Sequence, residues 1–252
     1  MILTVVGSGT LVPNAQRSTP SLMVQTHESQ FSIDGGSGTL RRQAEFGIDF
    51  RNTHWLLYTH VHPDHSLDLL HFLFASSYTP GFDRKRPLEL VGPRGFENFV
   101  EQYRDGILSW TKGGDPGFAV TELDHQESHA FGDVRVTALK LNHSITNMGY
   151  RVEDKQGRSF AFTGDTAWCE ELVDLARNVD VLVAECSGDE AHTLDGHLSA
   201  PEVGRLAAEA KVKQVVLTHL YPLPNDRGRI AEVARSYAGP ILLARDGDRF
   251  MV

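Results

Sequence analysis

Cysteine is scarce in this chain. Among 252 residues only Cys169 and Cys186 carry a thiol. Two isolated cysteines make neither the dense disulfide framework of a small secreted module nor a CxxC pair. The sequence therefore excludes a disulfide-stapled scaffold and favours a reducing compartment, in which each thiol contributes to packing rather than to chemistry.

Long apolar runs are also missing. No stretch of the sequence approaches the roughly 18 apolar residues that a membrane-spanning helix needs. The first residues, Met1 to Gly7, reach a glycine too early to form the apolar region of a signal peptide. We therefore predict a cytoplasmic protein that has no membrane partner.

Positive charge is in deficit. The chain has 24 Lys and Arg residues against 33 Asp and Glu residues, a formal net charge of −9. Because this balance repels nucleic-acid phosphates, we expect no strong nucleic-acid surface, and we interpret the densest basic run, Arg84-Lys85-Arg86, as a solvated loop.

With 40% hydrophobic residues the chain can bury a substantial core. The simplest organisation is one globular domain over residues 1–252.

A third glycine is missing from the first turn. Gly7-Ser8-Gly9 follows the strand-like residues Ile2–Val6 and invites a dinucleotide-binding interpretation. No further glycine follows at the required spacing, and Pro13 and Asn14 favour a loop over the start of a helix. The sequence therefore excludes this class of cofactor site.

What the chain does have is a turn crowded with metal-binding side chains. Residues 59–65 read THVHPDH, and an apolar, strand-like run precedes them. Leu67, Leu70 and Phe74 then recur at helical spacing, and Pro63 suits the first position of a helix. The sequence predicts a metal site on a strand-to-helix turn rather than a solvated loop.

Polar residues also end several apolar strands. The strand-like segments before His60, Asp165, Glu185 and His219 are each continuous apolar runs. In layered α/β proteins, residues at such strand ends gather at one rim of a sheet. We therefore expect these four side chains to share one site.

Other elements follow from apolar patterning and from breaks at glycine and proline. Further strands are expected over Ser21–Gln25, Gln30–Ile33, Leu88–Val91, Val134–Leu141, Ser159–Phe162, Val179–Ala184 and Gln214–Leu217. Helices are expected over Phe96–Arg104, Ala200–Ala210 and Arg229–Tyr237, with a glycine-rich loop from Gly106 to Gly117.

The spacing H-x-H-x-D-H resembles the signature of the metallo-β-lactamase superfamily. The resemblance implies an α+β fold, a four-layer αββα sandwich in which two sheets lie face to face and helices cover the outside. It also implies two divalent metal ions, because one such turn cannot aim four ligands at a single ion. Zinc is our first choice, with manganese or iron as alternatives, since mixed histidine and carboxylate sites accept several of these ions.

The resemblance extends to positions far along the chain. The matching metal ligands are His60, His62 and His143 for one ion, Asp64, His65 and His219 for the other, and Asp165 as the carboxylate that bridges both. A carboxylate can bridge two cations because its two oxygens bind separately and its charge offsets their repulsion.

Two further segments resemble the ribonuclease Z-like phosphodiesterases of this superfamily. Residues 34–39 are a glycine-rich Asp-x-Gly segment. Glu185 and the later His197-Leu198-Ser199 resemble the Glu and His-x-Thr pair of that branch. We take Glu185, His197 and Asp64 as the candidate catalytic residues, with His197 protonating the departing alkoxide and Glu185 orienting its ring.

One feature of the usual ribonuclease Z is absent. Those enzymes carry a long arm that grips tRNA between the third histidine and the bridging aspartate, whereas here 21 residues separate His143 from Asp165. We therefore predict a dinuclear phosphodiesterase that uses metal-bound hydroxide on a small-molecule or nucleotide phosphodiester.

The alternatives are a tRNA 3′-processing ribonuclease Z, a sulfate-ester or lactone hydrolase, and a metal-binding module without activity, because fold analogy does not fix the substrate. Dimers are common among relatives of this family, so the resemblance is also compatible with a homodimer.

Overall fold

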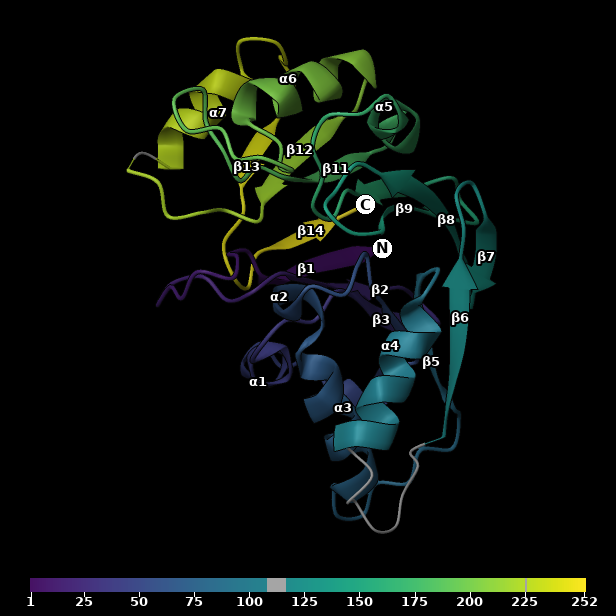
Figure 1. Ribbon diagram of the computed structural model, residues 1–252. Coiled ribbons are helices and arrows are strands. Elements are labelled where there is room, and N and C mark those ends of the chain that lie inside the picture. The colour runs from purple at the N-terminus through teal and green to yellow at the C-terminus, as the bar shows by residue number, and fades with distance from the viewer. Residues whose placement is uncertain (108–116, 225) are drawn as a thin grey trace.

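Two seven-stranded sheets form the centre of the part of the chain that the structure, a computed structural model, describes, which comprises residues 1–107, 117–224 and 226–252. The sheets lie face to face, and helices cover both outer faces (Figure 1). This is the predicted αββα sandwich.

The first sheet combines an antiparallel and a parallel block. Strands β14, β1, β2 and β3 pair antiparallel, and β3, β4, β5 and β6 pair parallel. In sheet order their bounds are β14 Arg249–Met251, β1 Ile2–Gly7, β2 Ser21–Gln25, β3 Gln30–Ile33, β4 Trp55–Leu57, β5 Leu88–Pro93 and β6 Phe118–Leu123.

The second sheet repeats this division. Strands β13, β12, β11 and β10 pair parallel, and β10, β9, β8 and β7 pair antiparallel. In sheet order their bounds are β13 Ile241–Leu243, β12 Gln214–Thr218, β11 Val181–Glu185, β10 Ser159–Phe162, β9 Asn147–Asp154, β8 Val134–Leu141 and β7 Ser128–Phe131.

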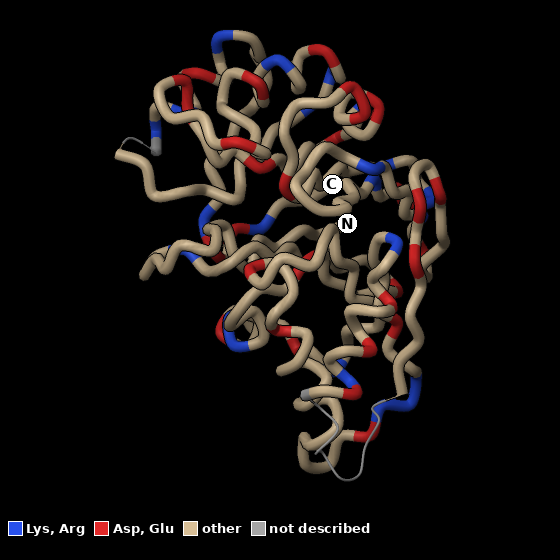
Figure 2. Tube along the Cα trace, viewed as in Figure 1, with Lys and Arg blue, Asp and Glu red and all other residues tan. Residues whose placement is uncertain are grey.

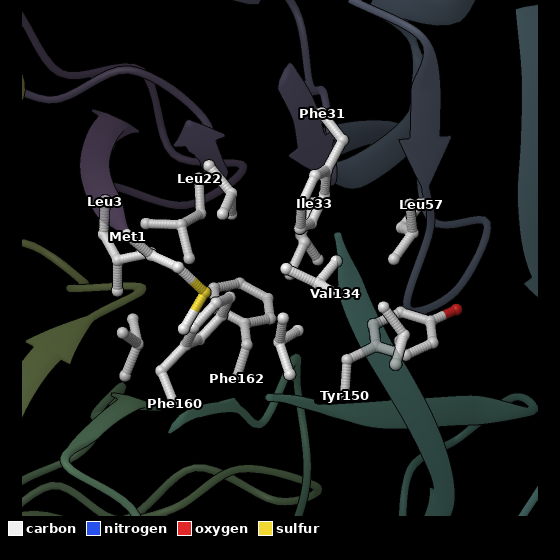
Figure 3. Close-up of a cluster of buried hydrophobic side chains, with 14 of the residues drawn as sticks. Met1, Leu3, Leu22, Phe31, Ile33, Leu57, Val134, Tyr150, Phe160 and Phe162 are labelled. Carbon is white, nitrogen blue, oxygen red and sulfur yellow. The ribbon is translucent and has the colours of Figure 1, made fainter. Parts of the chain in front are cut away.

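The main core fills the space between the two sheets. Alternate residues of each strand point inward, because successive side chains of a strand face opposite sides of its sheet. In Figure 3, side chains of the first sheet such as Leu22 and Phe31 face Tyr150, Phe160 and Phe162 of the second. These side chains are almost completely buried. Burying a side chain of this size contributes about 1.5–3 kcal/mol, so this layer fixes the two sheets against each other.

Helices cover the outer faces. The helices α1 (Thr39–Glu45), α3 (Asp68–Tyr78) and α4 (Phe96–Gln102) lie on the first sheet, and α5 (Glu171–Ala176), α6 (Ala200–Glu209) and α7 (Asp226–Val233) lie on the second (Figure 1). Each group seals a further apolar layer. The short helix α2 (Pro63–Ser66) begins at the predicted Pro63, and short helical turns span Phe50–Asn52 and Tyr103–Ile107.

Several predicted bounds differ from the structure. The helix predicted over Phe96–Arg104 is α-helical only to Gln102 and continues as a π-helical turn. The helix predicted over Arg229–Tyr237 is α7, which begins at Asp226 and ends at Val233. Gly239 and Pro240 lie just beyond, and neither suits a helix interior.

The second sheet and the loops account for the other differences. The strand predicted from Val179 begins at Val181, because Asn178 just before has a left-handed backbone with φ of 57°. The predicted glycine-rich loop from Gly106 to Gly117 lies mostly outside the described residues.

The solvated-loop interpretation of Arg84-Lys85-Arg86 is wrong for Arg84. Its guanidinium lies 5.7 Å and 5.3 Å from the ring centroids of Phe72 and Phe82 and donates to the backbone carbonyl of Thr53 at 2.7 Å. The side chain is therefore part of the packing. Elsewhere along the coloured trace in Figure 2, Lys and Arg are interspersed with Asp and Glu.

No helix in the described part of the chain is long and apolar enough to cross a membrane.

Candidate metal centre

Three histidine nitrogens converge at one end of the sandwich. His60 follows β4, His62 immediately precedes α2, and His143 follows β8. His60 Nε2 lies 3.0 Å from His62 Nδ1, which lies 3.3 Å from His143 Nε2. Three ring nitrogens this close suit a shared cation, which their lone pairs would bind together.

A second set lies beside the first. Asp64 and His65 belong to α2, and His219 follows β12. Asp64 Oδ2 is 3.8 Å from His65 Nε2 and 3.6 Å from His219 Nε2. His219 has a left-handed backbone with φ of 53°. Such a conformation is costly for a residue other than glycine and tends to persist at functional sites.

Asp165 lies between the two sets. Its Oδ1 is 3.3 Å from His65 Nε2, and its Oδ2 is 3.2 Å from His219 Nε2 and 3.9 Å from His60 Nε2. The residue before it, Gly164, has φ of 58°, and a Cβ there would lie 2.8 Å from the Cβ of Thr59. Only glycine therefore lets this turn come close enough to place Asp165 between the sets.

The residues fit bound metal on a direct structural criterion. Among the buried side-chain atoms of the described residues that make no hydrogen bond, three belong to predicted ligands: His65 Nε2, Asp165 Oδ1 and His219 Nε2. A buried polar atom without a partner costs about 1–3 kcal/mol and needs an explanation. Because all three atoms converge in one place, a bound cation supplies that explanation.

The electrostatics of the centre agree with this fit. Burial lowers the pKa of His60 well below its usual value, which keeps the imidazole neutral and able to bind a metal. Burial would raise the pKa of Asp165, but His219 and His65 outweigh it and hold the pKa well below its usual value. Burial would likewise lower the pKa of His65, yet Asp165 and Asp34 raise it. These carboxylates stabilise positive charge at the centre.

Asp34 supports both ligand sets, and its role was missed at the sequence level. It is buried at the end of β3, and its Oδ2 lies 2.8 Å from His65 Nδ1. The hydroxyl of Thr59 donates to Asp34 at 2.9 Å and lies 2.9 Å from His60 Nδ1. The sequence signal was the glycine-rich Asp-x-Gly segment that Asp34 begins, whose resemblance to the ribonuclease Z-like branch we noted without assigning Asp34 a role.

Ser187 was also missed. Its buried hydroxyl donates to Glu185 Oε2 at 2.6 Å and lies 2.9 Å from His219 Nδ1. Since the hydroxyl proton points to Glu185, its oxygen accepts from His219 Nδ1–H. This contact leaves the Nε2 lone pair of His219 facing the centre. No sequence pattern singled out Ser187.

Glu185 and His197 form a hydrogen-bonded pair next to Asp165. His197 Nδ1 lies 3.1 Å and 3.2 Å from the two carboxylate oxygens of Glu185 and 4.0 Å from Asp165 Oδ2. Burial would lower the pKa of His197, but Glu185 outweighs it and raises the pKa above its usual value. The pair can hold a proton beside the ligand sets.

A pocket of about 660 Å³ opens over this arrangement, and its wall includes His62, Asp64, His143, Asp165 and His197. The structure brings every predicted site residue to this one rim: His60, His62, Asp64, His65, His143, Asp165, Glu185, His197 and His219. Their individual roles stay predictions.

Comparisons with known proteins identify the family. The profile of the Beta-lactamase superfamily domain matches residues 31–220. The uncharacterized protein Rv1339 of Mycobacterium tuberculosis is 32% identical over 247 residues, which cover 95% of this chain and 88% of that protein. Ribonuclease Z of Mycobacterium avium is 29% identical over 283 aligned positions, which cover 99% of this chain and 98% of that enzyme.

A solved structure has the same fold. The metallo-β-lactamase fold protein YhfI of Bacillus subtilis superposes with a TM-score of 0.86 at 21% identity, covering 99% of this chain and 98% of its own. Most members of this superfamily are metal-dependent hydrolases. From the family profile, the relatives and the clustered histidines and aspartates, we conclude that the chain belongs to the metallo-β-lactamase superfamily, in its ribonuclease Z-like branch.

Proposed function

We propose that this protein is a dinuclear metal-dependent phosphodiesterase of the reducing cytoplasm. The observation that carries the proposal is that two ligand sets share Asp165 while the Glu185–His197 pair lies directly beside them in one pocket. Two cation sites and an adjacent proton donor suit the hydrolysis of a phosphodiester, in which charge develops on the phosphate and on the departing oxygen.

The ligand sets divide the work of holding the ions. His60, His62 and His143 would hold one ion, Asp64, His65 and His219 the other, and Asp165 would contact both. When bound, such ions supply an activated water and neutralise charge on the phosphate oxygens. Zinc is the first choice for both sites, with manganese or iron as alternatives.

His197 would protonate the leaving group. Glu185 holds His197 Nδ1, so Nε2 is the ring atom that would carry the transferable proton. Glu185 is itself fixed, because its Oε1 accepts from the backbone N–H of Thr166 at 2.6 Å. A fixed carboxylate orients the ring and stabilises its charged form.

The competing interpretation gives His197 the structural role of capping α6. That helix begins after Ser199, whose backbone N–H and hydroxyl both donate to Glu202, at 2.8 Å and 2.6 Å. The Ser199 side chain also accepts from the backbone N–H of Glu202, which completes the reciprocal capping arrangement of a helix N-terminus. The cap is therefore filled without His197, which supports the catalytic role.

The test compares two leaving groups. His197→Ala should slow hydrolysis of an alkyl or nucleoside phosphodiester by about 10²–10⁴-fold, the usual range for general acid catalysis. It should slow bis(p-nitrophenyl) phosphate much less, because p-nitrophenolate departs readily without a proton. The control is His192→Ala, which alters an exposed histidine in the same loop and should leave both rates unchanged.

Two results would count against this assignment. Equal losses on both substrates would give His197 a structural role. Loss of bound metal in the variant, measured by elemental analysis, would make His197 a ligand, since its ring also lies within reach of Asp165 and His219.

Ribonuclease Z activity is the second candidate, because the ribonuclease Z of Mycobacterium avium is 29% identical to this chain. Against it, residues 144–164 are occupied by β9, β10 and the tight turn between them, in which Gly157 N–H donates to Asp154. No arm fits there. Without such a surface, pre-tRNA binding would rest on a few phosphate contacts and be weak and salt-sensitive. Efficient, site-specific 3′ cleavage of pre-tRNA at physiological salt would favour this second candidate instead.

A further inference from the structure

The walls of the pocket carry an unusual charge for a phosphate-binding site. Among the described residues that line it, none is Lys or Arg. Apart from the predicted ligands and His197, its one charged lining residue is Asp195, which is exposed. Any binding of phosphate therefore depends on the centre itself, and the outer part of the pocket is neutral or negative.

The charge of an occupied centre would attract a phosphodiester. Two bound divalent ions, less the charges of Asp64 and Asp165, would leave a surplus of about two positive charges. A diester carries one negative charge and would be stabilised there. A second phosphate on the same substrate would lie farther out, where Asp195 repels it and no described basic side chain pairs with it.

The rim offers apolar contacts instead. Leu11 lines the pocket with 62% of its surface exposed. Tyr221 also lines it, and its ring centroid lies 6.0 Å from that of His197 and 5.9 Å from that of His219. The backbone carbonyl of Tyr221 accepts from the buried Arg229 at 2.9 Å, which fixes its position. An aromatic group next to His197 suits a flat, uncharged leaving group such as a nucleoside.

We propose, resting on the phosphodiesterase function above, that the pocket selects phosphodiesters whose esterified groups carry no further phosphate, and that Asp195 sets this selectivity. The substrate class is then a monoanionic diester of a nucleoside or similar flat alcohol. Nucleotides that bear an additional terminal phosphate are rejected.

The test uses matched dinucleotides. Metal-replete protein is assayed on TpT, on 5′-phosphorylated pTpT and on 3′-phosphorylated TpTp, and the readout is the ratio of kcat/KM values within each protein. We expect at least one phosphorylated form to be cleaved about tenfold more slowly than TpT. Asp195→Asn should narrow that ratio, and Asp195→Lys should abolish or invert it.

The matched control is Glu28→Lys, which changes the net charge by the same amount as Asp195→Lys but at a different place in the fold. Glu28 is exposed in the turn between β2 and β3, at the end of the sheet opposite to Asp34. Glu28→Lys should leave the ratio as in the unaltered protein, because an exposed charge beyond a Debye length, about 10 Å at 0.1 M salt, is screened. A change of ratio in this control would attribute the selectivity to net charge and overturn the role of Asp195.

Binding gives a second readout. By calorimetry, Asp195→Lys should bind thymidine 3′,5′-bisphosphate more tightly relative to thymidine 5′-phosphate than the unaltered protein does. Equal rates on all three dinucleotides, or a ratio unchanged in Asp195→Lys, would overturn the selectivity proposal and leave the phosphodiesterase function standing. If neither the dinucleotides nor bis(p-nitrophenyl) phosphate were hydrolysed, the proposed phosphodiesterase function would be refuted. Independently of that result, unchanged relative binding of the two thymidine phosphates in Asp195→Lys would overturn the role of Asp195.

Discussion

In the half of the centre formed by His60, His62 and His143, every predicted ligand is an imidazole, whereas the half formed by Asp64, His65 and His219 includes a carboxylate. The two halves also differ in exposure. In the first half His60 is buried and His62 and His143 are half-buried, whereas in the second half His65 and His219 are buried and Asp64 is half-buried. Charge and burial therefore both distinguish the halves, although each offers three ligands of its own.

The contacts behind the ligands differ in the same direction. In the three-histidine half, His60 Nδ1 contacts the hydroxyl of Thr59, which itself donates to Asp34. The other ring in that half with such a contact, His143, has its Nδ1 3.1 Å from the carbonyl of Gly196. In the half that contains Asp64, His219 also reaches a carboxylate through one hydroxyl, because Ser187 connects it to Glu185. The difference lies at His65, whose Nδ1 contacts the carboxylate of Asp34 directly.

Carboxylates behind a histidine raise its basicity and fix its orientation. The half that contains Asp64 should therefore bind its ion more tightly than the three-histidine half does. The comparison teaches that the candidate ligands alone do not predict which half binds metal more tightly. We expect the groups that hydrogen-bond to the ligands to decide the order.

Removing Asp165, the predicted ligand shared by both halves, should abolish the expected difference in metal affinity between the halves. Asp165→Ala takes away the one carboxylate that contacts both sets, so two cations would be left less well neutralised. We expect the unaltered protein to hold about two equivalents of metal, and the variant to lose both metal and turnover. Elemental analysis after dialysis checks this. A reproducible stoichiometry of one equivalent with full activity in the unaltered protein would refute the dinuclear assignment.

A smaller change should act more strongly on the half that contains His65. Asp34→Asn keeps the side-chain shape at a position with φ of 59°, which asparagine tolerates. It removes a carboxylate charge that contacts His65 directly and His60 only through Thr59. We expect about 10–100-fold weaker metal binding in that half, measured by competition with a chelator. Thr59→Val is the matched variant for the other half, since it removes only the hydroxyl next to His60. An equal or larger loss from Thr59→Val would contradict the ranking.

The smallest expected effect is the difference in metal affinity between the two halves of the unaltered protein, which can be measured without any substitution. Titration of the metal-replete protein with a chelator should remove the ion of the three-histidine half first. We expect the two midpoints to differ by about tenfold in chelator concentration, because the groups hydrogen-bonded to metal ligands alter metal affinity by about 10–100-fold. Native mass spectrometry counts the ions, and histidine NMR signals identify the half that is emptied. Simultaneous loss of both ions at one midpoint would mean that Asp165 couples the sites too strongly for their surroundings to matter.

Four of the candidate ligands could be identified from local sequence, whereas His143, Asp165 and His219 became candidate ligands through the family resemblance. Residues 59–65 place four ligand side chains in one turn, and Pro63 marks the start of the following helix. The apolar runs before Asp165 and His219 also predict strands from local sequence. We could therefore expect the ends of these strands to lie at one rim of a sheet. Helix ends were less accessible. We expected α7 to reach Tyr237, but it ends at Val233, and Tyr237 packs into the core and donates to the Val212 carbonyl at 3.2 Å.

The sequence by itself thus indicated the candidate ligands of the turn and the strands that precede the other candidates, because these depend on neighbours along the chain. The layered α+β class and the full candidate set came from the family resemblance. Only the tertiary structure decided which groups stand behind the ligands and what charge the pocket presents. Asp34 and His65 are 31 positions apart, and Ser187 and His219 are 32 positions apart. Such contacts form only when the ends of different strands meet at one rim, which no local pattern of residues encodes.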